Sequence, residues 1–220
     1  MLQRRSFRIT AALGFALAAF TLGCDNNEYF PTQSAGGGGL GAGGSVGGGS
    51  SANFSFTDPV NDRVAGEAEL GAPDIVQVSG SYDERALTLV LIFDAPVVPW
   101  SANQLNSLDG FIDFDLDENE STGIPAAADE FGGNAGIGAE MYLSLRDVGG
   151  THMTLVHAGT KQFTGVPAVF EGKTVTIRIP RSDLADDVDG RFRMALVVGH
   201  PAHPATDFAP DEGYWSVAGR

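Results

Sequence analysis

The chain has 220 residues, of which 28 are acidic and 13 basic, giving a formal net charge of −15 at pH 7. Such a negative field repels phosphate backbones, so we expect no nucleic-acid partner, whereas it attracts divalent cations. The single cysteine excludes an internal disulfide, so a hydrophobic core or a bound metal must stabilise the fold.

Residues 1–23 have the pattern of a secretory signal peptide. Arg4, Arg5 and Arg8 form a basic segment, and an uncharged, largely apolar run from Ile9 to Gly23 follows. This run is too short to span a bilayer. All 28 acidic residues but only ten of the 13 basic ones follow residue 23, so the exported chain would carry a charge of −18.

The sequence "TLGC", which ends at Cys24, resembles a bacterial lipoprotein box, in which signal cleavage frees a cysteine that is then lipidated. The resemblance implies a membrane partner, bound through a lipid on Cys24, and a place in the cell envelope. The alternative is an ordinary cleaved signal and a secreted protein with an unpaired thiol.

Residues 24–52 are expected to form a flexible linker. Ten of the sixteen residues from Ala35 to Ser50 are glycine and none is charged, which leaves too few side chains to bury a core. A flexible chain of this length would reach roughly 30 Å on average, enough to hold a domain clear of a membrane.

Residues 53–220 have the composition of one globular domain, in which short β-forming runs alternate with turn signals. No long helical period appears between the runs. This spacing favours an all-β fold, an antiparallel β-sandwich, over a parallel α/β sheet. The runs are "DIVQVSGSY" (74–82), "ALTLVLIF" (86–93), "GFIDFDL" (110–116), "EMYLSLRD" (140–147), "THMTLVHA" (151–158), "KTVTIRI" (173–179) and "RFRMALVVG" (191–199).

The stretch "FIDFDLDENESTG", residues 111–123, begins as a strand and ends as a loop. One face of the strand is apolar and the other carries carboxylates at every second position. Clusters of carboxylate and amide oxygens in a loop are what hard cations such as calcium require. The stretch therefore predicts a structural calcium site with the ligands Asp113, Asp115, Asp117 and Asn119.

The run "EMYLSLR" places Glu140, Tyr142, Ser144 and Arg146 on one face of a second strand. If this strand neighbours 111–117, Glu140 could be a further calcium ligand, or Arg146 could pair with the carboxylates. The alternative to a metal site is thus a solvated acidic face with an ion pair. A second acidic stretch, from Asp58 to Ile75, could cap strands through Asx turns without any metal.

Taken in order, several motifs resemble the family-nine carbohydrate-binding modules and the DOMON-like domains. The motifs are a D-P-x-x-D loop with a later P-D-I (58–62 and 73–75), the acidic stretch 113–123, a G-x-E strand opening (138–140) and "DFAPDEGYWSV" (207–217). The resemblance implies a jelly-roll-like sandwich, often with structural calcium, that binds sugars or other small extracellular ligands. Sugars stack on aromatic rings, so Tyr142, Trp100 and Trp215 are candidate ligand-binding residues, and Arg146, on the same strand face as Tyr142, is a fourth candidate.

The chain has no H-E-x-x-H motif and no phosphate-binding loop, and its one G-x-S-x-G match, residues 43–47, lies in the glycine-rich tract and not at the strand-to-helix turn of a nucleophile elbow. We therefore expect a non-catalytic cell-surface or periplasmic binding domain with a structural calcium ion. One alternative is a surface hydrolase whose site is assembled from loops. Another is a purely structural surface protein without a small ligand.

Overall fold

The structure is a computed structural model that describes residues 52–63, 71–146, 151–184 and 189–218. The predicted signal segment, Cys24 and the glycine-rich tract lie outside the described residues. Among those residues, no helix is both long and apolar enough to cross a membrane.

Nearly all regular structure in the described residues is β-strand. Two strands, β5 (Ile124–Pro125) and β6 (Gly138–Ala139), form a small separate ribbon. One short helix, α1 (Ala127–Glu130), and one 3₁₀ turn, η2 (Arg181–Asp183), interrupt the strands. The remaining strands are β1 (Ala52–Thr57), β2 (Ile75–Tyr82), β3 (Ala86–Phe93), β4 (Asp109–Asp115), β7 (Met141–Ser144), β8 (His152–His157), β9 (Phe163–Glu171), β10 (Thr174–Pro180), β11 (Phe192–His200), β12 (His203–Ala209) and β13 (Trp215–Val217).

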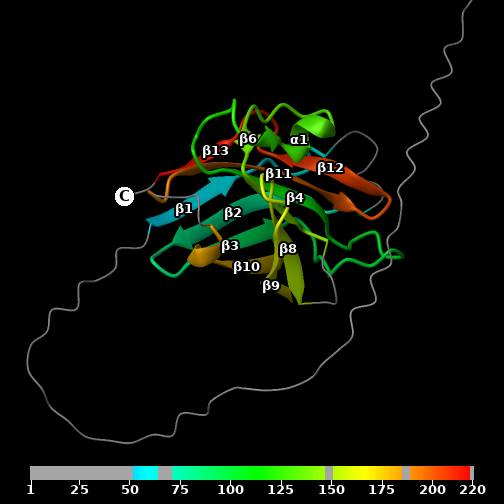
Figure 1. The fold of residues 1–220 in the computed structure, drawn as a ribbon. Helices are drawn as coiled ribbons and strands as arrows, with labels where there is room; N and C mark the ends of the chain where they lie inside the picture. Colours follow the sequence, from blue (N-terminus) through cyan, green and yellow to red (C-terminus); the bar gives the residue numbers. More distant parts are fainter. Residues whose placement is uncertain (1–51, 64–70, 147–150, 185–188, 219–220) are drawn as a thin grey trace, which may run out of the picture. The chain divides into compact units, whose positions relative to one another are not determined.

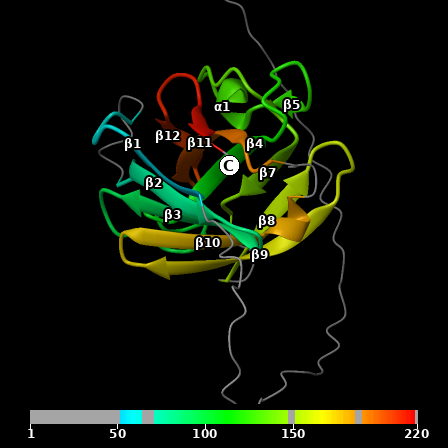
Figure 2. The ribbon, with the colours of Figure 1, turned by 90° about the vertical axis from the view of Figure 1, so that its left-hand side faces the viewer.

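These remaining strands form one sheet in the order β1-β2-β3-β10-β9-β8-β7-β4-β11-β12, with β13 also paired to β11. Every pairing between named strands is antiparallel. The sheet curls so that the layer of β2, β3 and β10 faces the layer of β4, β7 and β11 (Figures 1 and 2). The prediction of an all-β, antiparallel sandwich is confirmed.

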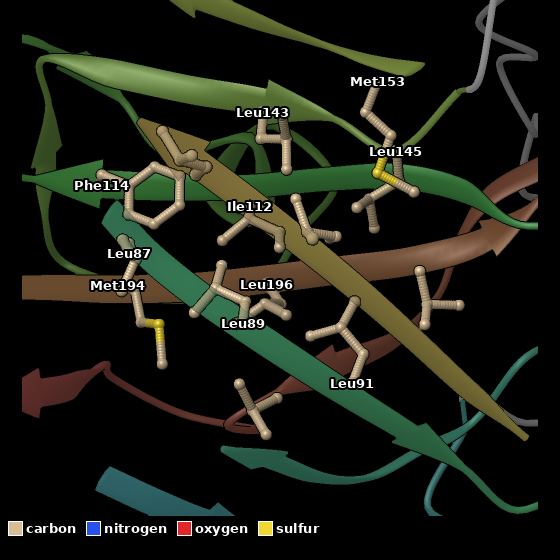
Figure 3. Packing of buried hydrophobic residues seen from close by; sticks show 14 of the residues in the cluster. Leu87, Leu89, Leu91, Ile112, Phe114, Leu143, Leu145, Met153, Met194 and Leu196 are labelled. Carbon is tan, nitrogen blue, oxygen red and sulfur yellow. The ribbon is translucent and has the colours of Figure 1, made fainter. Parts of the chain in front are cut away.

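The main core fills the space between these two layers (Figure 3). Leu87, Leu89 and Leu91 alternate along β3 and point at the opposite layer, where Ile112 and Phe114 of β4 meet them. All five side chains are fully buried. The alternation predicted for residues 111–117 is thus real, and its apolar face is the inner face of the sandwich.

A second, smaller core lies on the outer face of β4 and β11, under α1 and the loops beside it. Ala128 of α1 and Ile137 pack there with Ala195 and Val197 of β11. Both faces of β4 are therefore covered along much of its length. A carboxylate such as Asp113 on the outer face meets protein there and is 1% exposed.

All seven predicted runs form strands, with small differences at their ends. The prediction omitted β1, β9, β12 and β13, as well as the two-residue strands β5 and β6. β9 contains Gly165 and Pro167, and β12 contains Pro204. Such residues weaken the sequence signal of a strand, because proline cannot donate a backbone hydrogen bond and glycine has no side chain to pack.

Phe192 of β11 links the two layers through aromatic contacts, with ring centroids 6.4 Å from Phe54, 6.2 Å from Tyr82 and 6.0 Å from Phe114. Phe192→Ala should therefore lower the free energy of unfolding by about 3–5 kcal/mol, measured by urea denaturation. Phe163→Ala is the control, since Phe163 is 76% exposed, and should cost less than about 0.5 kcal/mol. Equal costs for the two variants would contradict this account of the core.

Candidate functional site

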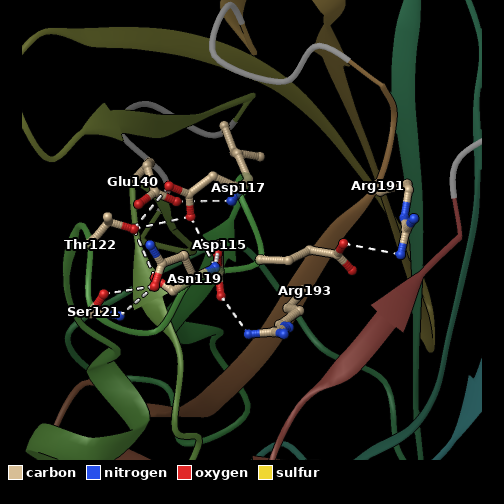
Figure 4. A network of polar contacts seen from close by, with 10 residues as sticks. Asp115, Asp117, Asn119, Ser121, Thr122, Glu140, Arg191 and Arg193 are labelled. Carbon is tan, nitrogen blue, oxygen red and sulfur yellow. Dashed lines mark hydrogen bonds and ion pairs between the residues drawn. The ribbon is translucent and has the colours of Figure 1, made fainter.

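Three carboxylates meet where β4 runs into its loop. Asp115, Asp117 and Glu140, here called the turn cluster, each offer one oxygen, and these three oxygens lie within 4.8 Å of one another (Figure 4). Asp115 ends β4, Asp117 follows in the loop, and Glu140 directly precedes β7. Because β7 pairs with β4, the strand register brings Glu140 to the carboxylates of the preceding loop.

The loop folds back through hydrogen bonds to its own carboxylates. The backbone N–H of Asn119 donates to Asp115 Oδ1 and to Asp117 Oδ1, both at 3.0 Å. The hydroxyl of Thr122 donates to Asp117 at 3.0 Å. The side-chain oxygen of Asn119 points elsewhere and accepts hydrogen bonds from Ser121. The structure thus assigns Asn119 a backbone role in shaping the turn.

Glu140 is held in place from one side. Its Oε2 accepts a hydrogen bond from the backbone N–H of Leu116 at 2.9 Å, and its own N–H donates to the carbonyl of Phe114. Its Oε1 is buried and accepts no hydrogen bond from any described residue. Close contact between Gly138 and Thr122, whose carbonyl oxygen would lie 2.0 Å from an added Cβ, keeps this part of the loop compact.

One arginine partly balances the turn cluster. Arg193 Nη1 lies 3.4 Å from Asp115 Oδ2, while Arg146, which the sequence offered as a partner, pairs with Asp109 instead. Burial and the nearby charge of Glu140 raise the pKa of Asp115 to about 6, although the Asn119 N–H and Arg193 act in the opposite direction. The net result is excess negative charge around a buried carboxylate.

Asp113, also predicted as a ligand, is not part of the turn cluster. Its Oδ2 accepts a hydrogen bond from the N–H of Ala127, the first residue of α1, at 2.8 Å. Burial raises the pKa of Asp113 to about 7 against the lowering effect of hydrogen bonds from Ala127 and Ala128. Alternation did place Asp113 and Asp115 on the same face, but α1 covers Asp113 and separates its surroundings from the turn.

A pocket of about 270 Å³ opens beside Asp113 on the outer face of the sheet. We call it the aromatic pocket, because Phe111, Phe131 and Tyr142 line it together with β5 and Glu130. The ring of Phe111 stacks on Phe131 and meets Tyr142 edge-on. Of the four predicted ligand-binding residues, Tyr142 is the one that lines this pocket.

The other three predicted ligand-binding residues lie in two different contacts. Trp100 and Arg146 both donate to Asp109 Oδ2, at 3.2 and 2.8 Å, and the guanidinium carbon of Arg146 lies 4.8 Å from the Trp100 ring centre. Trp215 stacks on Phe56, with ring centroids 5.1 Å apart and an interplanar angle of 5°. Part of its π-face is therefore covered by the protein itself.

The sequence reasoning missed a second acidic group, formed by Asp58, Asp62 and Asp207. Burial is the main cause that raises the pKa of Asp58 to about 8 and that of Asp207 to about 7, with neighbouring carboxylates adding to the shift of Asp58. The motifs D-P-x-x-D and "DFAPDEG" contained these residues. The contact between β12 and β2, which joins segments far apart in the sequence, brings the motifs together.

Comparisons of this chain with protein-family models, with curated proteins and with solved structures find no match.

In the metal-free protein, the free energy of unfolding should fall as the pH rises from 5 to 8. The pKa values of Asp113 and Asp207 in the folded chain, each about 7, lie above the ordinary value of 3.8. The folded chain therefore holds more protons than the unfolded chain in this range, and stability present at low pH is lost as the pH passes through the folded values. Urea denaturation in the presence of a chelator measures this.

Asp113→Asn should flatten this pH dependence, because asparagine keeps an acceptor for the N–H of Ala127 but cannot ionise. Asp83→Asn is the control. The backbone N–H groups of Arg85 and Ala86 lower the pKa of Asp83, so its titration lies below the range tested. Stability that stays constant or rises from pH 5 to 8 in the parent protein would contradict the proposed burial of these carboxylates.

Proposed function

We propose that the chain is a non-catalytic extracytoplasmic binding domain, stabilised by a calcium ion in the turn cluster. The observation that carries this proposal is the convergence of the oxygens of Asp115, Asp117 and Glu140 within 4.8 Å, with Glu140 Oε1 lacking a hydrogen bond among the described residues. Arg193, which pairs with Asp115, only partly balances the negative charge of the three carboxylates. A divalent cation would supply the missing positive charge and a partner for Oε1.

The donor set favours a hard cation. All three groups are carboxylates, and the loop around them is shaped by backbone N–H groups and by Thr122, without a thiol or an imidazole. Zinc and other softer metals prefer cysteine and histidine, whereas calcium takes six to eight oxygens from carboxylates, carbonyls and water. The exposed side of Asp117 leaves room for water ligands.

The aromatic pocket is the place we propose for a ligand. Ring faces with one or two polar groups suit an amphipathic molecule such as a single sugar unit, and a volume of about 270 Å³ is of that size. The loop after the turn cluster supplies Ile124 and Pro125 to its wall. A cation that fixes the loop would therefore also fix the pocket.

The envelope location remains part of the proposal. A lipid on Cys24 would anchor the chain to a membrane. The glycine-rich segment would hold the acidic domain at a distance from the membrane, whose negatively charged surface would repel it. Secretion after ordinary signal cleavage is the alternative.

A surface hydrolase is the competing function, because Asp113 and Glu130 are two carboxylates in one pocket, the arrangement used for general acid and base chemistry. The hydrogen bond from α1 to Asp113 favours a positioning role for this carboxylate. Screening glycan binding together with hydrolysis of ester and glycoside substrates separates the two functions. If the protein turns over one of these substrates, and Asp113→Asn abolishes this activity without loss of folding, the proposed non-catalytic function is wrong.

Calcium should raise the melting temperature of the protein. Because a ligand present at 100 times its Kd adds about 2.7 kcal/mol, the expected shift is on the order of 5–10 °C. Asp117→Asn should reduce this shift while leaving the melting temperature in chelator nearly unchanged. Glu120→Gln is the matched control, since Glu120 is an exposed carboxylate of the same loop, and it should keep the full shift.

The outcome that contradicts the calcium site is an equal loss of stability in Asp117→Asn with and without calcium. Such a result would leave the turn cluster as a solvated acidic face with the Arg193 ion pair.

Ligand binding should depend on the aromatic pocket. Phe131 is 42% exposed and stacks on Phe111, so Phe131→Ala should weaken binding of a neutral sugar at least tenfold with little loss of stability. Titration calorimetry with a panel of mono- and disaccharides measures this, with Phe163→Ala as the control for an exposed phenylalanine elsewhere. Binding that Phe131→Ala leaves unchanged would exclude the pocket as the ligand site.

A further inference from the structure

Three carboxylates from distant parts of the sheet meet in the second acidic group. Asp58 directly follows β1, Asp62 lies four residues further on, and Asp207 belongs to β12. Each offers one oxygen, and the three oxygens lie within 4.8 Å of one another. We call this set the clasp cluster, because β1 and β12 are the first and last strands in the order of the sheet.

All three of these carboxylates have buried oxygens that accept no hydrogen bond from the described residues. Asp58 is 7% exposed and Asp207 is 1% exposed. Asp58 Oδ2 and Asp207 Oδ1 accept no hydrogen bond from the described part of the chain, whereas Asp207 Oδ2 accepts one from the N–H of Ile75 at 2.8 Å. A buried carboxylate oxygen without a partner costs free energy, so a group that binds there would be strongly favoured.

Arg63, whose charge acts on Asp207, makes its ion pairs with other carboxylates. Arg63, whose side chain is 5% exposed, lies 2.6 Å from Asp94 and 3.6 Å from Asp74. Asp74 also accepts a hydrogen bond from the N–H of Asn61. Arg63 thus pairs with a neighbouring pair of acids and acts on Asp207 only from a greater distance, and none of the ion pairs among the described residues includes a member of the clasp cluster.

We propose that Asp58, Asp62 and Asp207 bind a second divalent cation, of the hard, oxygen-seeking class to which calcium belongs. All three ligands are carboxylates, and both carboxylate oxygens of Asp62 are buried and accept no hydrogen bond from the described residues, although the residue as a whole is half-buried.

The ion would join the two ends of the curled sheet. β1 hydrogen-bonds to β2 alone among the named strands, so it is an edge strand, and β12 lies at the other end of the order. The described contact from Ile75 to Asp207 already links β2 with β12. A cation shared by Asp58 and Asp207 would add a direct link from the end of β1 to β12 and would resist separation of the edge strand.

Calcium stoichiometry tests the proposal. After removal of metals, equilibrium dialysis of the parent protein should give two calcium ions per chain, one for each cluster. Asp58→Asn should give one, with circular dichroism confirming the fold. Asp62→Asn is the second variant, chosen because Asp62 is half-buried and its replacement disturbs packing less. Glu171→Gln, at an exposed end of β9, should still give two.

Asp117→Asn distinguishes this site from the turn cluster. The parent protein could bind a single calcium ion that is lost in Asp117→Asn and kept in Asp62→Asn. This result would overturn the clasp site and leave the proposed function standing. A single calcium ion that is lost in Asp62→Asn and kept in Asp117→Asn would support the clasp site and refute the turn site.

Hydrogen exchange gives a second readout. Calcium should slow exchange of the β1 amides at least tenfold in the parent protein and in Asp117→Asn, but not in Asp62→Asn. Equal protection of β1 by calcium in both variants would overturn the clasp role.

Discussion

Carboxylates buried at the ends and on the outer faces of strands are the constraint on which the rest of this structure depends. An ionised carboxylate removed from water needs hydrogen bonds, an opposite charge or a metal. The described residues show the first two solutions. Asp113 accepts the N–H of Ala127, and Asp109 pairs with Arg146 under the ring of Trp100. Some carboxylate oxygens of the turn and clasp clusters have neither a hydrogen bond nor a counter-charge among the described residues, which is why we propose that these clusters bind cations.

The curled sheet creates this problem and also limits where it occurs. The inner face is closed by leucine, isoleucine and phenylalanine side chains from both layers, so acidic residues are confined to the outer face and the loops. On β4 the outer face is then covered by α1, which packs on Ala195 and Val197 of β11. A small helix over a central strand thus converts a solvated position, that of Asp113, into a buried one with a raised pKa.

Local patterns predicted the features that depend on neighbours in sequence. The alternation of Ile112 and Phe114 with Asp113 and Asp115 gave the correct faces of β4, and the acidic loop after it does fold around its carboxylates. Features that depend on strand order did not follow from the sequence. Arg193, and not Arg146, lies beside Asp115 because β11 pairs with β4. The position of α1 over Asp113 depends on packing between segments that are distant in the sequence. Likewise, no local pattern indicates that Asp207 meets the loop after β1.

A chain with one cysteine cannot close its sheet with a disulfide, so the two ends must be held in another way. The stacking of Phe56 on Trp215 and the hydrogen bond from Ile75 to Asp207 contribute, but both act near an edge strand whose residues alternate between half-buried and exposed. A cation between Asp58 and Asp207 would act at the same edge and with greater strength where calcium is abundant. Its stabilisation would grow with calcium concentration, so the sheet would close most firmly in the extracytoplasmic compartment where we propose that the protein works.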